Sequence, residues 1–404
     1  MHADGILSLT AVDGEMADSV RLWTPPVIGR TVYGGQIAAL ATLSCGRTVP
    51  DGYLPHHVHV TYVAPAYGDA EGASSLRFTA TRDRDGRSFA ARSCRVTQSG
   101  AVVATAAVSF VATGGARHVA RPFLEHSASC SAVLRPPSEP YSLPDAVARL
   151  QAYLNDPRLP ATYVPLLESL MEASATHPID IRFVNPLPNA LDRRVASQPT
   201  QLAWIRFSGV QDGTTVINDA APAALLPLAE LVFLSDWWLL LTSLLPLGQY
   251  MFPGDVSFMT TLSHALWIHD PSALASAPPG NWFLLQTESP RLGGGRAFVT
   301  GRMWDPQSGA LVASLAQEGV LHFRRGAEGV GAPARGLRLD AVGAQLVSER
   351  SWSDRSSLEV GDDSERSSSD RSSLEVGDAP PNGERNVEEA FSRPSVPQQQ
   401  RARL

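Results

Sequence analysis

Asp236 is a carboxylate within one of the most apolar segments of the chain, which runs from about residue 223 to residue 247. Leucines and aromatic residues flank it on both sides, including Trp237 and Trp238. Burying a carboxylate costs free energy unless the group is paired, hydrogen-bonded or protonated. A buried carboxylate with a perturbed pKa can serve as a general base, so Asp236 is a candidate catalytic residue. The alternative is a structural carboxylate that caps a neighbouring loop.

Two other polar side chains lie in apolar segments that could meet Asp236. Gln317 interrupts the strand-like segment 312–321, where a buried amide must find hydrogen-bond partners. Thr261 lies in the strand-like segment that follows the acidic stretch, from which it could reach the helix across the sheet. An Asp, a Thr and a Gln around one cavity can hold a water molecule whose proton the carboxylate accepts. We therefore predict a hydrolytic site formed by Asp236, Thr261 and Gln317, with no side-chain nucleophile.

The elements that must position these residues occur twice in the same order. Each half begins with an apolar helical segment, followed by alternating segments typical of antiparallel strands. Turn sequences such as Asp85-Gly86 and Ser308-Gly309 separate the strands. The predicted first half is helix Gly35–Cys45 and strands Val58–Val63, Leu76–Arg82, Ser88–Thr97 and Val102–Val111. The predicted second half is helix Ala223–Leu244 and strands Phe258–Ile268, Trp282–Glu288, Arg296–Trp304 and Leu311–Phe323.

An internal repeat supports this reading. Residues 98–105 match residues 307–314 at an offset of 209, and residues 59–63 match residues 264–268 at an offset of 205. At the 209 offset Gln317 falls opposite Val108, and the first helix has no carboxylate to match Asp236. One helix against a curved antiparallel sheet is a hotdog unit. The sequence therefore predicts an α+β double hotdog whose polar site belongs to the second half.

The predicted boundaries follow from these elements and from composition. Residues 1–120 are expected to form the N-terminal hotdog and residues 178–326 the C-terminal hotdog with the site. Residues 121–177 are Pro-rich and are expected to be an irregular linking and packing segment, with a short helix near Asp145–Leu154. Residues 327–404 are rich in Ser, Asp, Glu, Arg and Gly and repeat one segment, which predicts a disordered tail.

Composition excludes several classes of protein. The net charge of −7 gives no reason to expect a nucleic acid partner, and three cysteines are too few and too scattered for a disulfide framework or zinc site. The stretch at 223–247 is long enough to span a membrane, but Pro227, Glu230 and Asp236 interrupt it, so we expect a core helix. No serine-hydrolase elbow is present. We expect no metal and no cofactor.

Five motifs occur in an order that resembles the type II acyl-CoA thioesterase family, the TesB-like double-hotdog enzymes. They are Tyr33-Gly34-Gly35-Gln36, residues 85–92, Ser235-Asp236, residues 260–269 and residues 311–319, within a resemblance that covers about residues 22–323. In that family the catalytic residues are an Asp on the second hotdog helix, a Thr on the next strand and a Gln on the last. These fall on Asp236, Thr261 and Gln317. Ser263 stands where the family pattern has Asp.

The resemblance implies hydrolysis of acyl-CoA thioesters to a free acid and CoA. Gly35, Arg87 and Arg92 are the candidate substrate-binding residues, the two arginines for CoA phosphates. Two alternatives stay open: a thioester-releasing enzyme or acyltransferase of a dedicated pathway with the same site, and a noncatalytic acyl-CoA-binding protein.

The final tripeptide Ala402-Arg403-Leu404 resembles the Ser-Lys-Leu peroxisomal address. With an acyl-CoA enzyme, it predicts recognition by a peroxisomal import receptor and a peroxisomal location, with the cytoplasm as the alternative. Because hotdog units associate through sheet edges, we also expect a homo-oligomer.

Overall fold

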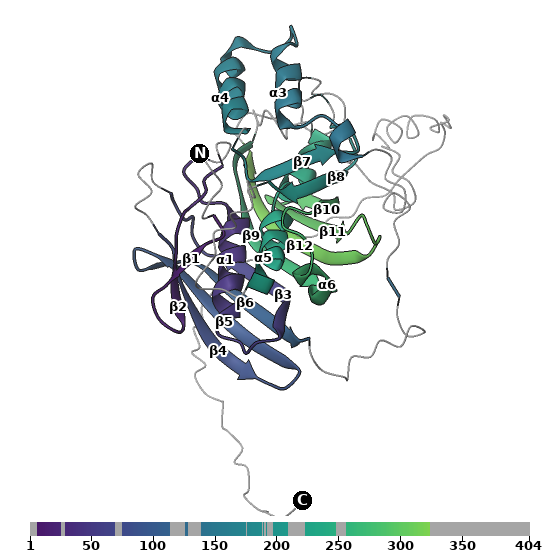
Figure 1. Ribbon diagram of the computed structural model, residues 1–404. Coiled ribbons are helices and arrows are strands. Elements are labelled where there is room, and N and C mark those ends of the chain that lie inside the picture. The colour runs from purple at the N-terminus through teal and green to yellow at the C-terminus, as the bar shows by residue number, and fades with distance from the viewer. Residues whose placement is uncertain are drawn as a thin grey trace, which may run out of the picture. The chain divides into compact units, whose positions relative to one another are not determined.

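The computed structural model describes residues 6–25, 29–68, 75–113, 126–127, 139–174, 176–187, 189, 191, 197–208, 223–247 and 256–323. The tail predicted at 327–404, with its terminal tripeptide, lies outside these residues. In the described part the strands form one antiparallel sheet of twelve strands, in the order β1-β2-β4-β5-β6-β3-β9-β12-β11-β10-β8-β7 (Figure 1). β3 and β9 pair in the middle of this order and join the two halves.

The first half supplies one helix and six strands. They are β1 (Leu9–Ala11), β2 (Met16–Ser19), α1 (Gly34–Gly46), β3 (Tyr53–Tyr62), β4 (Arg77–Asp85), β5 (Phe89–Gln98) and β6 (Ala101–Ala112).

The second half repeats this order. It contains β7 (Ile179–Phe183), β8 (Thr200–Phe207), η5 (Ala223–Leu225), α5 (Leu226–Ser235), η6 (Leu240–Leu247), β9 (Val256–Ile268), α6 (Pro271–Ala275), β10 (Phe283–Gly293), β11 (Arg296–Trp304) and β12 (Leu311–Phe323). All eight strands predicted from the sequence are present, and the double-hotdog fold is confirmed. Strands β1, β2, β7 and β8 lie at the two ends of the sheet and come before the helix of their half, and the sequence analysis did not predict them.

Between the halves lie η3 (Pro140–Ser142), α3 (Ala146–Leu154), η4 (Ala161–Tyr163) and α4 (Val164–Ser174). The short helix expected near Asp145–Leu154 is confirmed as α3. Its start is fixed by Asp145, whose side chain accepts a hydrogen bond from the Ala148 N–H. Helix α4 was not expected in a segment predicted to be irregular.

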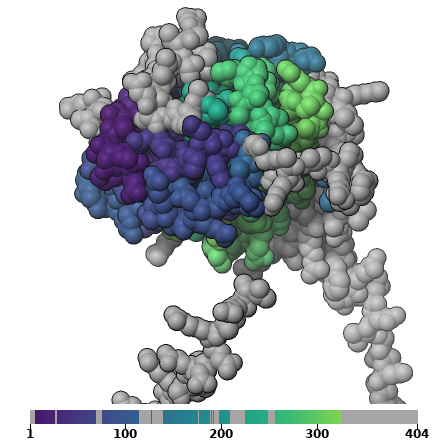
Figure 2. All heavy atoms as spheres, turned by 60° about the horizontal axis from the view of Figure 1, so that its bottom comes forward, coloured from purple at the N-terminus to yellow at the C-terminus, as the bar shows by residue number. Residues whose placement is uncertain are grey.

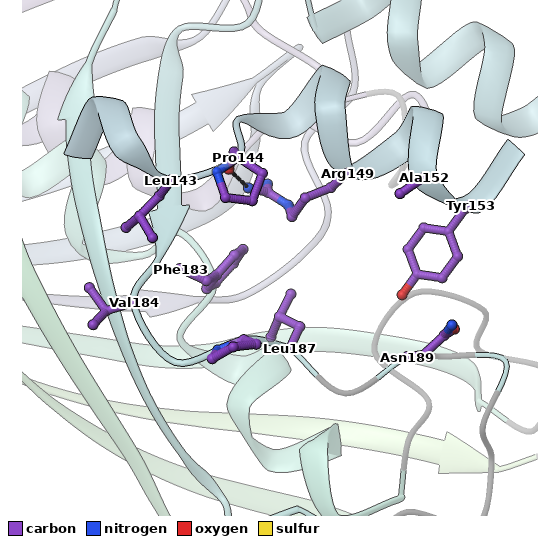
Figure 3. A pocket seen from close by; sticks show the side chains of 10 residues that line it. Leu143, Pro144, Arg149, Ala152, Tyr153, Phe183, Val184, Leu187 and Asn189 are labelled. Atoms are coloured by element: carbon purple, nitrogen blue, oxygen red, sulfur yellow. Dashed lines mark hydrogen bonds between the residues drawn. The ribbon is translucent and has the colours of Figure 1, made fainter. Parts of the chain in front are cut away.

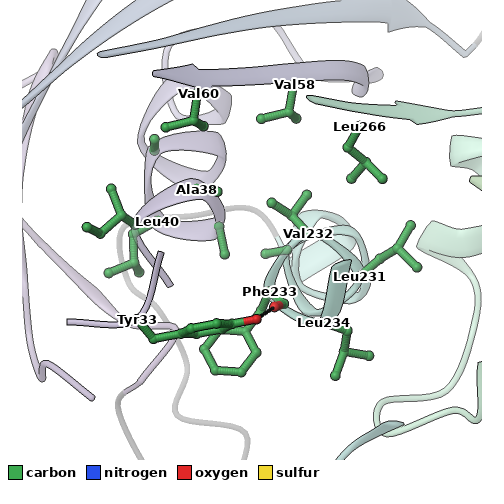
Figure 4. Close-up of a cluster of buried hydrophobic side chains, with 14 of the residues drawn as sticks. Tyr33, Ala38, Leu40, Val58, Val60, Leu231, Val232, Phe233, Leu234 and Leu266 are labelled. Atoms are coloured by element: carbon green, nitrogen blue, oxygen red, sulfur yellow. Dashed lines mark hydrogen bonds between the residues drawn. The ribbon is translucent and has the colours of Figure 1, made fainter. Parts of the chain in front are cut away.

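Helices α1 and α5 pack against each other inside the sheet and form the core (Figure 4). Helix α1 carries small residues such as Ala38, which allow a close approach to α5, and both helices are buried along almost their whole length. Valines of β3 and Leu266 of β9 cover them from the sheet. This explains why the second helix can be apolar on all faces. In the space-filling view the purple and blue atoms of the first half directly abut the green atoms of the second (Figure 2).

The helix predicted at Ala223–Leu244 is wrong in its extent. The α-helix ends at Ser235, and the chain turns through Trp238, whose φ of 70° is left-handed and rare for a bulky residue. A 3₁₀ helix, η6, then begins at Leu240. The stretch Leu226–Leu247 is long and apolar enough for a membrane span by composition, yet 78% of its most apolar window is buried within the protein. Asp236 therefore lies at the C-terminal end of a short core helix, where its side chain can leave the helix surface.

The sheet register confirms one repeat offset and corrects the other. In the first half a register shift directly follows the pair Val96–Ala104, and in the second half one directly follows the pair Met303–Ala313. Ala104 and Ala313 are therefore equivalent, which agrees with the offset of 209. Val108 then corresponds to Gln317, as predicted.

The offset of 205 is wrong by one residue. Val108 pairs with Val58, and Gln317 pairs with His264, so His264 corresponds to Val58 and not to His59. His59 is exposed whereas His264 is buried. A slip of one residue places a side chain on the opposite face of a sheet, and sequence identity alone misled the alignment here.

Candidate active site

The three predicted catalytic residues meet through the amide of Gln317. From β12, its Nε2 donates one hydrogen bond to the Asp236 carboxylate and a second, of 3.0 Å, to Thr261 Oγ1 on β9. Gln317 is only 1% exposed and Asp236 9%, so these contacts lie away from bulk water. Residues separated by as many as 81 positions in the chain are thus brought together by the geometry of one sheet and one helix end.

A β-bulge puts Thr261 on the site's face of the sheet. Gln317 of β12 pairs with His264 of β9, and Gly319 of β12 pairs with Thr261 of β9. Between these two pairs β12 advances by two residues, whereas β9 advances by three. Strict alternation would send side chains three positions apart to opposite faces. The register shift absorbs one extra residue, so that Thr261 lies on the same inner face as His264 and can contact Gln317.

The carboxylate of Asp236 lies at the N-terminus of α1, in the other half of the protein. Helix α1 has no side-chain cap of its own, and the Gly35 N–H donates to Asp236. The partial positive charge of a helix N-terminus stabilises an anion there. Two glycines permit this approach: a Cβ on Gly34 would lie 2.9 Å from Asp236 Oδ2, and one on Gly35 would lie 2.5 Å from the Phe233 carbonyl oxygen. Gly35, predicted to bind substrate, is therefore a backbone donor to the candidate base.

Burial and hydrogen bonding act on Asp236 in opposite directions. Burial raises the pKa of the Asp236 carboxyl to about 6, while the hydrogen bonds from Gln317 and the Gly35 N–H oppose this rise. The nearby tyrosines respond to the same environment: burial, and then the charge of Asp236, raise the pKa of Tyr33 and of Tyr62 well above the usual value. A carboxyl with a pKa near 6 is largely ionised at neutral pH and still basic enough to accept a proton.

Two tyrosines fix the helix ends that carry the site, and sequence reasoning assigned a role to neither. The Tyr33 hydroxyl donates to the Phe233 carbonyl of α5 at 2.9 Å (Figure 4), and the Tyr62 hydroxyl donates to the Gly34 carbonyl at 2.8 Å. Tyr33 lies in the motif 33–36, which gave a signal. For Tyr62 the sequence gives none beyond its place in a strand.

Aromatic rings cover this end of α5. The ring of Trp23 contacts those of Tyr33, His177 and Phe233, and Tyr33 also contacts Phe233. Trp237 contacts Trp23, Tyr33 and His177, and the ring centroids in all these pairs are 4.8–5.7 Å apart. Burial lowers the pKa of His177 to about 4, so this histidine is neutral at neutral pH. The cluster keeps the surroundings of Asp236 apolar, which is the cause of its raised pKa.

The buried amide of Gln317 has capacity left for one more partner. Its Oε1 finds no hydrogen-bond donor among the described residues. The Thr261 oxygen accepts from Gln317, so its own proton can be donated to a third group. An amide oxygen, a carboxylate and a hydroxyl proton are together the acceptors and donor that orient one water molecule.

The prediction that Arg92 contacts CoA phosphates is wrong. Its side chain is fully buried, and its five N–H groups donate to the Thr48 hydroxyl and carbonyl, the Arg84 and Ala91 carbonyls, and the Asp85 carboxylate. A guanidinium has five donors, so none remains for a phosphate. Arg92 instead fixes the β4–β5 hairpin to the end of α1. Arg87, in the exposed turn of that hairpin, stays a prediction.

A cavity of about 310 Å³ lies apart from these residues, between α3 and β7 (Figure 3). Phe183 and Leu187 form part of its wall, together with Arg149, whose guanidinium lies 4.8 Å from the Phe183 ring centroid. None of the three predicted catalytic residues lines it. Phe183 also contacts Trp238, with ring centroids 4.6 Å apart.

Comparison with known proteins defines the class. Residues 22–111 match the family described as the acyl-CoA thioesterase N-terminal domain, and residues 144–321 match the acyl-CoA thioesterase C-terminal domain. The chain belongs to the acyl-CoA thioesterase family, in its double-hotdog form.

Individual relatives agree with this assignment. Acyl-coenzyme A thioesterase 8 of Homo sapiens is 30% identical over 321 residues, which cover 79% of this chain and 88% of that protein. Peroxisomal acyl-coenzyme A thioester hydrolase 1 of Saccharomyces cerevisiae is 22% identical over 325 residues, covering 74% and 88%.

Solved structures show the same fold. Acyl-CoA thioesterase II TesB2 of Mycobacterium marinum has a TM-score of 0.52 at 22% identity and covers 81% of this chain and 99% of its own. A hot dog fold protein of Alicyclobacillus acidocaldarius has a TM-score of 0.53 at 20% identity, with 79% and 97% covered.

Proposed function

We propose that this chain hydrolyses acyl-CoA thioesters to a free acid and CoA, with Asp236 activating the attacking water directly. The observation that carries the proposal is the position of the Gln317 amide, which holds the Asp236 carboxylate and the Thr261 hydroxyl around one buried point. Family membership supports the reaction type, and the geometry supports the assignment of roles.

In the proposed reaction, the water oxygen attacks the thioester carbonyl carbon while Asp236 takes one of its protons. The other water proton can be accepted by Gln317 Oε1, and the Thr261 hydroxyl can donate to the water oxygen. Collapse of the tetrahedral species breaks the C–S bond, and the proton held by Asp236 passes to the leaving sulfur. Atoms and charge balance, and the protein gains its rate mainly by positioning the reactants.

The oxyanion of this intermediate needs a hydrogen-bond donor. Both protons of the Gln317 amide are used by Asp236 and Thr261, and the Gly35 N–H donates to Asp236. A catalytic arrangement in which Gln317 serves the oxyanion therefore requires it to release one of these two partners. This makes Gln317 important for the turnover number as well as for the pKa of Asp236.

The test is the release of free thiol from palmitoyl-CoA, followed with a thiol reagent, for wild type and Asp236→Asn. We expect the variant to lose at least about a hundredfold in kcat, because removal of a general base typically costs 10²–10⁴-fold. Glu230→Gln is the matched control, since Glu230 is another buried carboxyl of the same helix. Full activity of Asp236→Asn would overturn the role assigned to this residue.

Other outcomes of the same assay address the two alternatives. A noncatalytic acyl-CoA-binding protein would bind the ester with no thiol release in the wild type. An acyltransferase would release thiol only when an acyl acceptor is added, and the acyl group would appear on that acceptor rather than as free acid. A panel of CoA esters of different acyl length then defines the substrate class.

We also propose a peroxisomal location, supported by the relative from Saccharomyces cerevisiae whose name states it. The predicted receptor contact through Ala402-Arg403-Leu404 stays a prediction. Unchanged punctate fluorescence of an N-terminally tagged chain after deletion of Leu404 would contradict it. The expected homo-oligomer is likewise a proposal, to be checked by sedimentation.

A further inference from the structure

His264 is a buried histidine that the proposed reaction does not use. It is 1% exposed, lies on β9 and pairs directly with Gln317 of β12. Its Nε2 lies 2.8 Å from the hydroxyl oxygen of Ser235, the last residue of α5. Burial lowers the pKa of His264 to about 4, so the ring is neutral at neutral pH. A neutral histidine thus connects the strand beside Gln317 to the helix residue directly before Asp236.

The hydrogen bonds of Ser235 fix the tautomer of this histidine. The Ser235 hydroxyl donates to the Val232 carbonyl at 2.8 Å and has only one proton. It must therefore accept from His264, which places the ring proton on Nε2. The opposite nitrogen, Nδ1, is then an acceptor, and it finds no hydrogen-bond partner among the described residues.

Packing alone does not explain a histidine at this position. In the first half the equivalent position is Val58, which pairs with Val108, is buried to the same extent and has no polar group to satisfy. A buried imidazole with one unpaired nitrogen is less favourable than a valine in a site of this kind. The two halves therefore differ at both members of one strand pair, valine and valine in one, His264 and Gln317 in the other.

The end of α5 is where such a contact has most effect. The last carbonyl groups of a helix lack intrahelical partners, and helix ends fray. Tyr33 holds the Phe233 carbonyl from one side, and His264 holds Ser235 from the other. Asp236 follows immediately, and its carboxylate must stay within hydrogen-bond reach of Gln317 and of the Gly35 N–H.

We propose that His264 is a positioning residue for the thioesterase reaction. In its neutral Nε2–H form it holds Ser235, and through Ser235 it keeps the Asp236 carboxylate within hydrogen-bond reach of Gln317. This inference rests on the proposed function. It predicts that loss of the contact lowers kcat with little change in KM, because His264 is 1% exposed and acts through Ser235.

The experiment compares His264→Val, His264→Gln and Ser235→Ala with wild type in the palmitoyl-CoA assay. We expect kcat to fall on the order of a hundredfold in His264→Val, since a displacement of about 1 Å at a catalytic group has that effect. His264→Gln retains an amide donor that can reach Ser235 and should restore most of the lost activity. Val58→Ala is the matched control for disturbed packing at the equivalent position, and its kcat should stay close to that of wild type.

A double-mutant comparison separates positioning through Ser235 from an independent effect. If His264 acts through Ser235, the double variant His264→Val/Ser235→Ala is no slower than the worse single variant. The inference would be overturned if the fold-losses in kcat of the two single variants multiply in the double variant, or if Ser235→Ala keeps the wild-type kcat. Should His264→Val fail to fold, Ser235→Ala and His264→Gln still decide the question. An inactive wild type would instead refute the proposed function, and this outcome is distinguishable from an active wild type whose variants show no loss of kcat.

Discussion

The raised pKa of Asp236 predicts a specific pH dependence of hydrolysis. A general base works only when ionised, so kcat/KM should fall as the pH drops through about 6, the pKa set by burial. At pH 5, one unit below this pKa, about a tenth of the carboxyl groups are ionised, and the rate should be roughly tenfold below its plateau at pH 8. An aspartate with the ordinary pKa of 3.8 would remain almost fully ionised at pH 5 and give a nearly flat profile.

The substrate must be chosen so that its own ionisation does not produce the same fall in kcat/KM at low pH, which is called the acid limb of the profile below. Phosphate monoesters such as the 3′-phosphate of CoA lose their second proton near pH 6. The profile should therefore be measured with an acyl-N-acetylcysteamine thioester, which has no phosphate, between pH 5 and pH 8. Circular dichroism at each pH confirms that the protein remains folded.

A second variant tests the cause of the pKa. Gln317→Ala removes a donor that stabilises the charged carboxylate. Hydrogen bonds to charged groups contribute about 1.5–3 kcal/mol, so the limb should move upward by about one to two pH units, besides any fall of the plateau. A flat profile from pH 5 to 8 in wild type, or an unmoved limb in Gln317→Ala, would refute the reasoning.

Three further predictions concern Glu230, Gly35 and the two arginines of the β4–β5 hairpin. Burial raises the pKa of Glu230 from 4.5 to about 7, so the folded state binds the carboxyl proton more tightly than the unfolded state does. The free energy of unfolding should therefore fall by up to about 3 kcal/mol as the pH rises from 4.5 to 7. In Glu230→Gln, urea unfolding should lack this part of the pH dependence; an identical dependence contradicts the prediction. Gly35→Ala should lower the free energy of unfolding by about 1–3 kcal/mol and should also lower kcat, because the alanine Cβ would lie 2.5 Å from the Phe233 carbonyl oxygen. Thermal melts check the first effect and the thiol assay checks the second. Arg87→Ala should raise KM for CoA esters without changing the melting temperature, whereas Arg92→Ala should lower the melting temperature; the reverse pattern would show that the roles are exchanged.

Much of the fold follows from local pattern. The alternation of apolar and polar residues, with turn sequences between, predicted the eight long strands, and in β11 and β12 it predicted their limits as well. Strand β8 was not predicted, because its residues are buried on both faces and do not alternate. Strand β7 does alternate but is only five residues long. The end of α5 was also not predicted, since the apolar sequence continues past Asp236 while the chain turns at Trp238 into a left-handed conformation.

The sequence by itself determined which residue types are available for chemistry. A carboxylate among leucines and tryptophans, and a glutamine where the first half has Val108, identify a polar site because buried polar groups need partners. Only the tertiary structure decided which of them meet. The β-bulge turns Thr261 to the face of Gln317, and the close approach of α1 brings the Gly35 N–H to Asp236. It also assigned Arg92 to the hairpin rather than to a ligand, because a strand pattern specifies the face on which a side chain lies but not which hydrogen bonds it makes there.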